Sequence, residues 1–170
     1  ESAGADCMGV QEVKAQHEHV AERFDKVAGM GGHFHYAQKK GYSGVGLYTR
    51  KKPSDVIIGI GDPEFDAEGR WVEARFDTAR RKLSVISCYF PSGSSGEERQ
   101  AAKFRFLGRI FPHLMRLKAE REFILVGDVN IAHLMRLKAE REFILVGDVN
   151  IAHLMRLKAE REFILVGDVN

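Results

Sequence analysis

The stretch EFILVGDVN, residues 122–130, decides the class of fold. Its apolar part, FILVG, predicts a strand that is buried on both faces in the middle of a sheet. Gly127 allows the backbone to leave that sheet tightly. Because side chains alternate along a strand, Asp128 and Asn130 point to one side beyond its carboxyl end and Val129 points to the other. Such a pair can hold a phosphate and a water, and a local Asx turn is the alternative for either residue.

A long helix is expected immediately before this strand, over residues 96–121. Ser95 and Glu98 have the spacing of a capping box, which supplies acceptors for the unpaired amides of the first turn. Pro112 is expected to kink the helix or to split it in two, because proline lacks an amide donor. Apolar residues that recur at helical spacing should face the core, namely Phe104, Leu107, Ile110, Leu114 and Leu117.

The part of the chain before this helix reads mainly as strands. Apolar runs predict strands at 5–12, 56–60, 71–77 and 83–90, and residues 33–50 predict a strand, a turn at 39–41 and a second strand. A helix is expected at 13–28, ended by glycines, with its inward residues at Val13, Val20, Phe24 and Val27. Strands separated by both turns and helices indicate a mixed-sheet α/β sandwich, with Trp71 in its core.

The segment HLMRLKAEREFILVGDVN occurs three times without a change, at 113–130, 133–150 and 153–170, with a period of 20 residues. Each copy reads as a short helix followed by a buried strand, so the copies could stack as an α/β array. Natural arrays keep a core pattern while surface residues drift, but here the charged residues are unchanged too. We interpret copies two and three as a tandem duplication or an assembly error, and hypothesise that they pair as surrogate strands.

Composition and charge bound the class of protein. The 170 residues are 44% hydrophobic and 29% charged, as in a globular domain, and no apolar run approaches the roughly 20 residues of a membrane helix. The net charge of +2 is weak evidence for nucleic-acid binding, and basic clusters at 39–40, 50–52 and 80–82 could follow phosphates or decorate loops. Cys7 and Cys88 are expected to be buried free thiols, which fits a reducing cytoplasm.

Two further strand ends carry candidate site residues. Glu12 closes the first strand, where a solvated carboxylate is the alternative to a ligand. Tyr89 closes a later strand, on the face that also carries Ser87, and a core or sheet-edge tyrosine is the alternative.

Histidines are weaker candidates for a metal site. The pairs His17/His19 and His33/His35 are spaced by two residues, and only a strand would put such a pair on one face. Because no third ligand is evident, we expect exposed or core histidines.

Several stretches together resemble the exonuclease III branch of the endonuclease/exonuclease/phosphatase superfamily. They run from about residue 3 to residue 133 and read QEVKAQ, GYSGVGLYTRKKP, DPEFDAEGRWVEARF, SCYFPSGSSGEERQAAKFRFL and EREFILVGDVNIAH. The resemblance implies a DNase I-like two-sheet α/β sandwich with helices outside. We therefore expect an incomplete exonuclease III-like catalytic domain at 1–133, followed at 134–170 by two further copies of the helix–strand unit.

The resemblance also implies roles for the candidate residues. Glu12 corresponds to the ligand of Mg²⁺, with Mn²⁺ as an alternative, and Tyr89 to a tyrosine that contacts the scissile phosphate. Asp128 corresponds to an aspartate that handles a proton on the attacking water or the leaving group, and Asn130 to a residue that positions the phosphate. The expected substrate is duplex DNA, cut 5′ to an abasic site or trimmed from 3′ ends, and the expected protein is a cytoplasmic monomer that binds no membrane.

Two elements of the family pattern are not found in this sequence, an asparagine-bearing first strand and a C-terminal Asp-His pair. We therefore expect the 170-residue chain to be inactive or nearly so, and to expose apolar surface. Two other functions remain as alternatives. One is a non-catalytic repeat scaffold based on residues 113–170, and the other is a phosphodiesterase or lipid phosphatase of the same superfamily.

Overall fold

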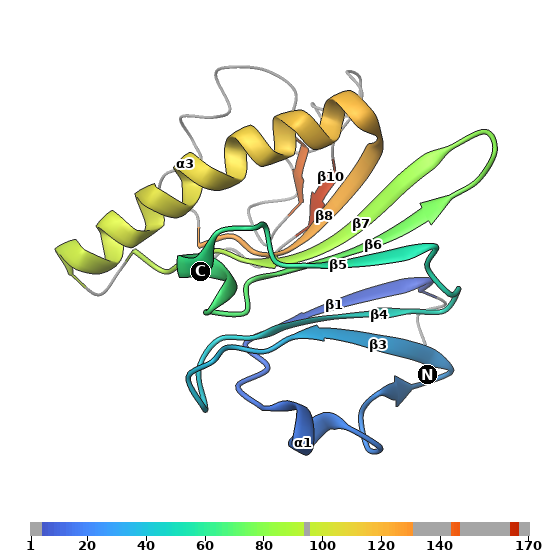
Figure 1. Cartoon of the computed structure of the whole chain (residues 1–170), viewed down its shortest axis with the longest axis horizontal. Coiled ribbons are helices and arrows are strands. Elements are labelled where there is room, and N and C mark those ends of the chain that lie inside the picture. The colour runs from blue at the N-terminus through green and yellow to red at the C-terminus, as the bar shows by residue number, and fades with distance from the viewer. Residues whose placement is uncertain (1–4, 94–95, 131–143, 147–163, 167–170) are drawn as a thin grey trace.

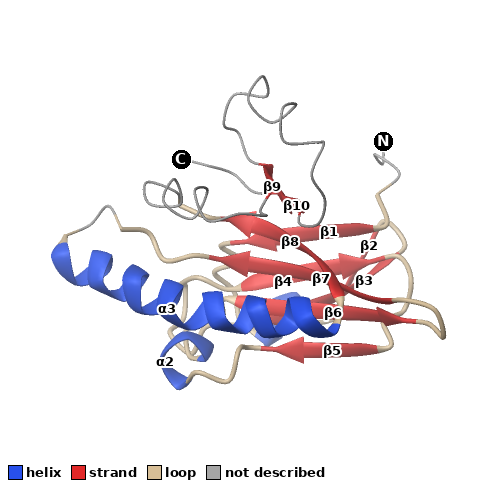
Figure 2. Cartoon of the chain, turned by 90° about the horizontal axis from the view of Figure 1, so that it is seen from above, coloured by secondary structure: helices blue, strands red, loops and turns tan. Residues whose placement is uncertain are grey.

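The chain folds into two β-sheets that pack face to face, with a long helix, α3 (Glu97–Glu120), on the outer face of one sheet (Figure 1 and Figure 2). The computed structural model describes residues 5–93, 96–130, 144–146 and 164–166. The first sheet is antiparallel, and its order is β1 (Cys7–Gln11), β4 (Val45–Thr49), β3 (Met30–His35) and β2 (Lys26–Val27). The short helix α1 (His17–Val20) lies on the outer side of this sheet.

The second sheet is mixed. Its order is β5 (Asp55–Ile58), β6 (Trp71–Asp77), β7 (Lys82–Tyr89), β8 (Glu122–Asp128), β10 (Ile164–Val166) and β9 (Ile144–Val146). The β5–β6 and β6–β7 pairs are antiparallel, whereas β7–β8, β8–β10 and β10–β9 are parallel. The short helix α2 (Pro63–Asp66) precedes β6, and α3 makes the crossover from β7 to β8. The expected α/β sandwich is confirmed.

Alternation along β7 divides the core into two parts. Val85 faces the first sheet and packs with Val45, Leu47, Val72 and Ala74. Ile86 and Cys88 face α3 and pack in a second cluster with Phe65, Trp71, Phe106, Ile110, Leu114, Leu117, Phe123 and Leu125. The second sheet is therefore buried on both faces, as the apolar stretch before Gly127 predicted. The two cysteines are free, as expected, although Cys7 is only half-buried.

The strands expected from the sequence are confirmed, with ends that differ by up to three residues, but the helix expected at 13–28 is wrong. Only His17–Val20 is helical, and Lys26–Val27 form a strand. The amides of Val13 and Lys14 donate to the carbonyl oxygens of Gly44 and Ser43 at 3.1 and 2.8 Å, and the backbone is left-handed at Lys14 and Glu22, which interrupts a right-handed helix. Phe24, expected to face inward, is 47% exposed.

The helix expected at 96–121 is confirmed as α3, with three differences. The chain remains helical through Pro112, so the helix is not split there. Phe104 is 45% exposed, and Phe106 takes its place in the core because the buried stripe runs through Phe106, Ile110, Leu114 and Leu117. The N-cap is Gly96, and Ser95 lies outside the described residues.

The repeat contributes two short strands to the described structure. β10 pairs with β8 in parallel, so that Ile164 lies opposite Ile124, and β9 pairs with β10 so that Ile144 lies opposite Ile164. Identical residues of the three copies therefore align in one sheet, as the surrogate-strand hypothesis requires. The helices expected in copies two and three fall outside the described residues.

Candidate active site at the ends of β1, β7 and β8

Three strands finish at the same end of the sandwich, on the left in Figure 1: β1 of the first sheet, and β7 and β8 of the second. β1 lies close to β7 because Gly9 has no side chain. A Cβ at Gly9 would lie 2.7 Å from Val126 Cγ2 and 3.2 Å from Ser87 Oγ. The Gln11 side chain then crosses between the sheets and donates from Nε2 to Ser87 Oγ at 3.0 Å. This hydrogen bond fixes the end of β1 against β7. Glu12, which follows Gln11, therefore lies near Tyr89, which is on the same face of β7 as Ser87.

Glu12 and Tyr89 meet as a result. The Tyr89 hydroxyl donates to Glu12 Oε1 at 3.0 Å, and Glu12 also forms an ion pair with Lys14. The Lys14 ammonium and then the Tyr89 hydroxyl lower the pKa of Glu12 below its ordinary value. The carboxylate is half-exposed. Glu12 is thus an ionised oxygen donor on the surface, held at one side by a phenol.

Tyr89 is kept protonated by its surroundings. Burial, then the hydrogen bond and charge of Glu12, raise the pKa of Tyr89 from 10.0 to about 12. The charge of Asp128 acts in the same direction, and Arg70 opposes it. Tyr89 therefore remains a hydrogen-bond donor at neutral pH.

Asp128 lies opposite Tyr89 in the parallel β7–β8 pairing. Phe90 N donates to the Asp128 carbonyl at 2.9 Å, which carries the pairing one residue past the strands. A Cβ at Gly127 would lie only 1.8 Å from the Cys88 carbonyl oxygen. Glycine is therefore required at position 127, and the reason is this close approach of β7 to β8.

Asn130 forms an Asx turn with Asp128, the alternative that the sequence left open. Its amide donates to Asp128 Oδ1 at 3.1 Å, its Nδ2 donates to the Phe90 carbonyl at 3.0 Å, and its backbone is left-handed with φ of 47°. Val129 points the other way and is fully buried. The turn ties the end of β8 to the end of β7, beside Tyr89.

The structure thus brings all four candidate residues to one end of the sandwich. Glu12 and Tyr89 touch directly, Asp128 is the strand partner of Tyr89, and Asn130 reaches the site through Phe90 and Asp128.

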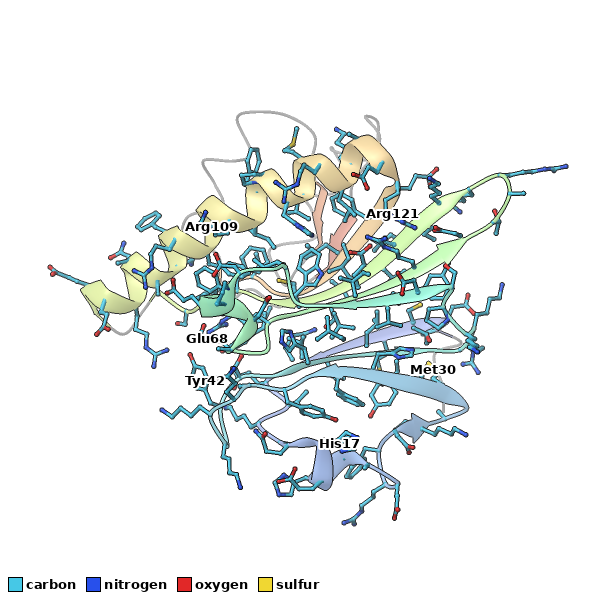
Figure 3. The ribbon with its side chains drawn as sticks, viewed as in Figure 1. His17, Met30, Tyr42, Glu68, Arg109 and Arg121 are labelled. Atoms are coloured by element: carbon cyan, nitrogen blue, oxygen red, sulfur yellow. The ribbon has the colours of Figure 1, made fainter. Side chains whose placement is uncertain are left out.

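Arg70 is a site residue that the sequence reading missed. It is 3% exposed, its guanidinium lies 4.9 Å above the Tyr89 ring, and Nη1 donates to the Tyr89 carbonyl at 3.0 Å. Nε pairs with Glu68 at 2.6 Å and Nη2 donates to Tyr42 at 3.2 Å. Tyr42 and Glu68 lie together at this end of the molecule (Figure 3). Arg70 follows a turn and precedes an apolar strand, a position that normally suggests only a solvated arginine.

A single carboxylate can serve as one ligand of a divalent ion. Mg²⁺ prefers oxygen ligands and is held by one or two carboxylates, waters and substrate phosphates. The exposed, ionised Glu12 oxygens fit that chemistry. Among the described residues, no three His, Cys, Asp or Glu side chains form a metal-binding group.

The histidines are occupied elsewhere. His35 is buried and its Nδ1 donates to the Trp71 carbonyl at 3.0 Å, and His33 contacts Thr49 Oγ1 at 3.4 Å. His19 Nδ1 accepts from the Gln16 amide, and His17 packs against the Tyr36 ring. These are structural roles, as expected.

Comparison with known proteins identifies the family. The profile of the endonuclease/exonuclease/phosphatase family matches residues 1–166. The chain belongs to this family. The resemblance to exonuclease III and AP endonucleases that the sequence indicated is confirmed by relatives at about 30% identity.

An exodeoxyribonuclease of Bacillus subtilis is 33% identical over 100 residues, which is 59% of this chain and 38% of the relative. A DNA-(apurinic or apyrimidinic site) endonuclease of Dictyostelium discoideum is 30% identical over 134 residues, 78% of this chain and 36% of the relative. Exodeoxyribonuclease III of Haemophilus influenzae is 34% identical over 131 residues, 75% of this chain and 48% of the relative. The chain therefore spans less than half the length of these relatives.

Among solved structures, the catalytic domain of Xenopus laevis APE2 superposes with a TM-score of 0.60 at 26% identity. The match covers 76% of this chain and 51% of that domain. It supports the same two-sheet architecture. Within the described part of the chain, no helix has the length and hydropathy required to span a membrane.

Proposed function

We propose that this site belongs to a Mg²⁺-dependent phosphodiesterase that acts on duplex DNA, cutting 5′ to abasic sites and trimming 3′ ends. The observation that carries the proposal is the direct contact of Tyr89 with Glu12, beside Asp128 on the neighbouring strand. A phenol donor, a metal-type carboxylate and a second carboxylate at one strand end suit a phosphate that is attacked by water. The relatives named as exonucleases and apurinic-site endonucleases support the substrate.

Each residue has a role in this proposal. Glu12 holds the cation, which when bound polarises the phosphate and stabilises the leaving oxygen. Tyr89, neutral up to pH values near 12, donates to a non-bridging phosphate oxygen. Asp128 accepts or delivers a proton at the water or the leaving oxygen, a contribution on the order of 10²–10⁴ in rate. Asn130 keeps Asp128 oriented through the Asx turn.

Arg70 adds a fixed positive charge. Its guanidinium is held by Glu68, Tyr42 and the Tyr89 carbonyl, so it cannot leave the site readily. The guanidinium lies over the face of the Tyr89 ring, whereas the Tyr89 hydroxyl donates to Glu12. Arg70 thus places a cation against Tyr89 that partly offsets the charges of Glu12 and Asp128 there.

We also propose that the 170-residue chain binds DNA but cleaves it slowly or not at all. Each of the five described histidines has a partner away from the site, so none can assist the water there. Among the described residues, Glu12 belongs to no group of three His, Cys, Asp or Glu side chains that could hold a metal ion.

Binding and cleavage must be measured separately to test this function. A fluorescent duplex with one tetrahydrofuran abasic analogue is titrated with purified chain in Mg²⁺, and the matched duplex without the lesion and an inositol phosphate serve as competitors. We expect saturable binding that Tyr89→Phe weakens by about tenfold, the cost of one hydrogen bond to a charged group. Preference for the inositol phosphate would overturn the DNA assignment, and rapid cleavage by the chain would overturn the proposed inactivity.

A further inference from the structure

A lysine from α3 lies buried behind the Asp128–Asn130 turn. Lys103 is only 6% exposed, although lysine is seldom buried without a partner. Its stem passes beside Gly93, where an added Cβ would lie 3.2 Å from Lys103 Cδ. The absence of a side chain at position 93 thus leaves the path through which Lys103 reaches the end of β8.

Two groups of the turn interact with the Lys103 ammonium. Nζ donates to the backbone carbonyl of Asn130, and the charge of the Asp128 carboxylate acts on the same ammonium. Burial lowers the pKa of Lys103, whereas Asp128 raises it. A buried charge is costly unless it is paired and hydrogen-bonded, so the position of this ammonium is coupled to the position of the turn.

The turn is held both by residues at the strand ends and by the helix. Asn130 has a left-handed backbone, which residues with a Cβ rarely adopt. Its amide is held by Asp128 at the end of β8, and its side chain by Phe90, which directly follows β7. Lys103 binds the backbone carbonyl oxygen of Asn130, and this contact comes from the helix.

We propose that Lys103 is a positioning residue, which locks the Asn130 turn from behind and supplies the counter-charge that faces Asp128. This inference rests on the function proposed above. Lys103 does not touch the phosphate, since it is buried on the helix side of the turn. It acts by keeping the Asp128 carboxylate and the Asn130 amide in place when an anionic substrate arrives.

The first test observes the ammonium in the unmodified chain. In ¹⁵N NMR spectra, Lys103 Nζ protons should exchange with water slowly enough to give a separate signal, whereas those of the exposed Lys51 and Lys52 should not. A Lys103 ammonium that exchanges as fast as these two would overturn the proposal. No substitution is needed, so failure of a variant to fold cannot obscure the result.

The second test removes the charge and keeps the stem. In Lys103→Met, hydrogen exchange at the Asn130 amide should accelerate roughly 10- to 100-fold, the equivalent of one lost hydrogen bond to a charged group. Exchange at Ile86 in β7 should not change. Lys118→Met is the matched control, because it removes a lysine from the last turn of the same helix. Lys103→Arg, which keeps a charged donor, should restore most of the protection.

Binding of the abasic duplex separates this inference from the function on which it rests. We expect Lys103→Met to weaken binding by about the factor that Tyr89→Phe does, with Lys118→Met unchanged. If the parent chain binds DNA but Asn130 exchange is the same in parent and Lys103→Met, the positioning role is wrong and the function stands. If the parent does not bind but the exchange difference appears, the function fails and the locking of the turn is upheld.

Discussion

Replacing Gly127 by alanine tests the strand contact on which the whole site depends. The new Cβ would lie 1.8 Å from the Cys88 carbonyl oxygen, 2.8 Å from its carbonyl carbon and 3.1 Å from its amide nitrogen. All three atoms belong to backbone, so no side-chain rotation relieves the contact. β7 and β8 must separate at the Cys88–Gly127 pair, next to Tyr89 and Asp128.

The cost follows from what the separation breaks. Overpacking in a core costs about 1–3 kcal/mol, and each ladder hydrogen bond lost beside it adds about 1 kcal/mol. We expect Gly127→Ala to lower the free energy of unfolding by about 3 kcal/mol or more. For a chain of this size the midpoint of thermal unfolding should fall by roughly 6–12 °C.

Urea unfolding followed by circular dichroism measures this difference, and Gly31→Ala is the matched control. Gly31 also lies in a strand, β3, but a Cβ there would meet no atom within 4 Å. Alanine at position 31 should leave the stability unchanged or raise it by up to about 1 kcal/mol. A loss below about 1 kcal/mol for Gly127→Ala, or an equal loss in both variants, would refute the reasoning from the close contact.

The remaining predictions concern Tyr89, Arg70 and Glu73. In ¹³C NMR titrations, where the Tyr89 signal is assigned by comparison with Tyr89→Phe, Tyr89 should remain protonated at pH 11. Glu12→Gln should lower the pKa of Tyr89 but not to 10.0, because burial is the larger cause. An unchanged pKa in Glu12→Gln would contradict the hydrogen bond between Tyr89 and Glu12. Since the folded-state pKa of Tyr89 is raised, its contribution to stability is complete below pH 10 and is lost as the pH rises toward 12, so the Tyr89→Phe variant should lose less stability than the parent between pH 10 and 12. Arg70→Lys should destabilise the chain by about 2 kcal/mol in urea, because lysine cannot reproduce the three directed hydrogen bonds, and a neutral effect would argue against a fixed guanidinium. Glu73 is 1% exposed and pairs with Arg75 at 2.7 Å. In urea unfolding, Glu73→Ala should lower the free energy of unfolding by about 2–3 kcal/mol. The double variant Glu73→Ala/Arg75→Ala should lose less than the sum of the two single variants.

The wrong helix at 13–28 shows where periodicity misleads. Val13, Val20, Phe24 and Val27 have helical spacing, but spacing describes only the side chains. The backbone donors of Val13 and Lys14 find acceptors in the loop before β4, and Glu12, Lys14 and Glu22 adopt left-handed conformations. The left-handed residues interrupt the helix, and the contacts of Val13 and Lys14 with the loop before β4 involve residues far along the chain.

Local pattern alone was sufficient for the buried strand before Gly127, the alternation along β7, and the placement of Glu12, Tyr89, Asp128 and Asn130 at strand ends. These features depend on apolar runs and on the alternation of strand side chains between two faces, and both are properties of neighbouring residues. The meeting of Glu12 with Tyr89, the buried charges of Arg70 and Lys103, and the contact of Gly127 with Cys88 came only with the tertiary structure. They depend on which strands lie side by side and in what register, and contacts across 19 to 77 residues leave no periodic trace in the sequence.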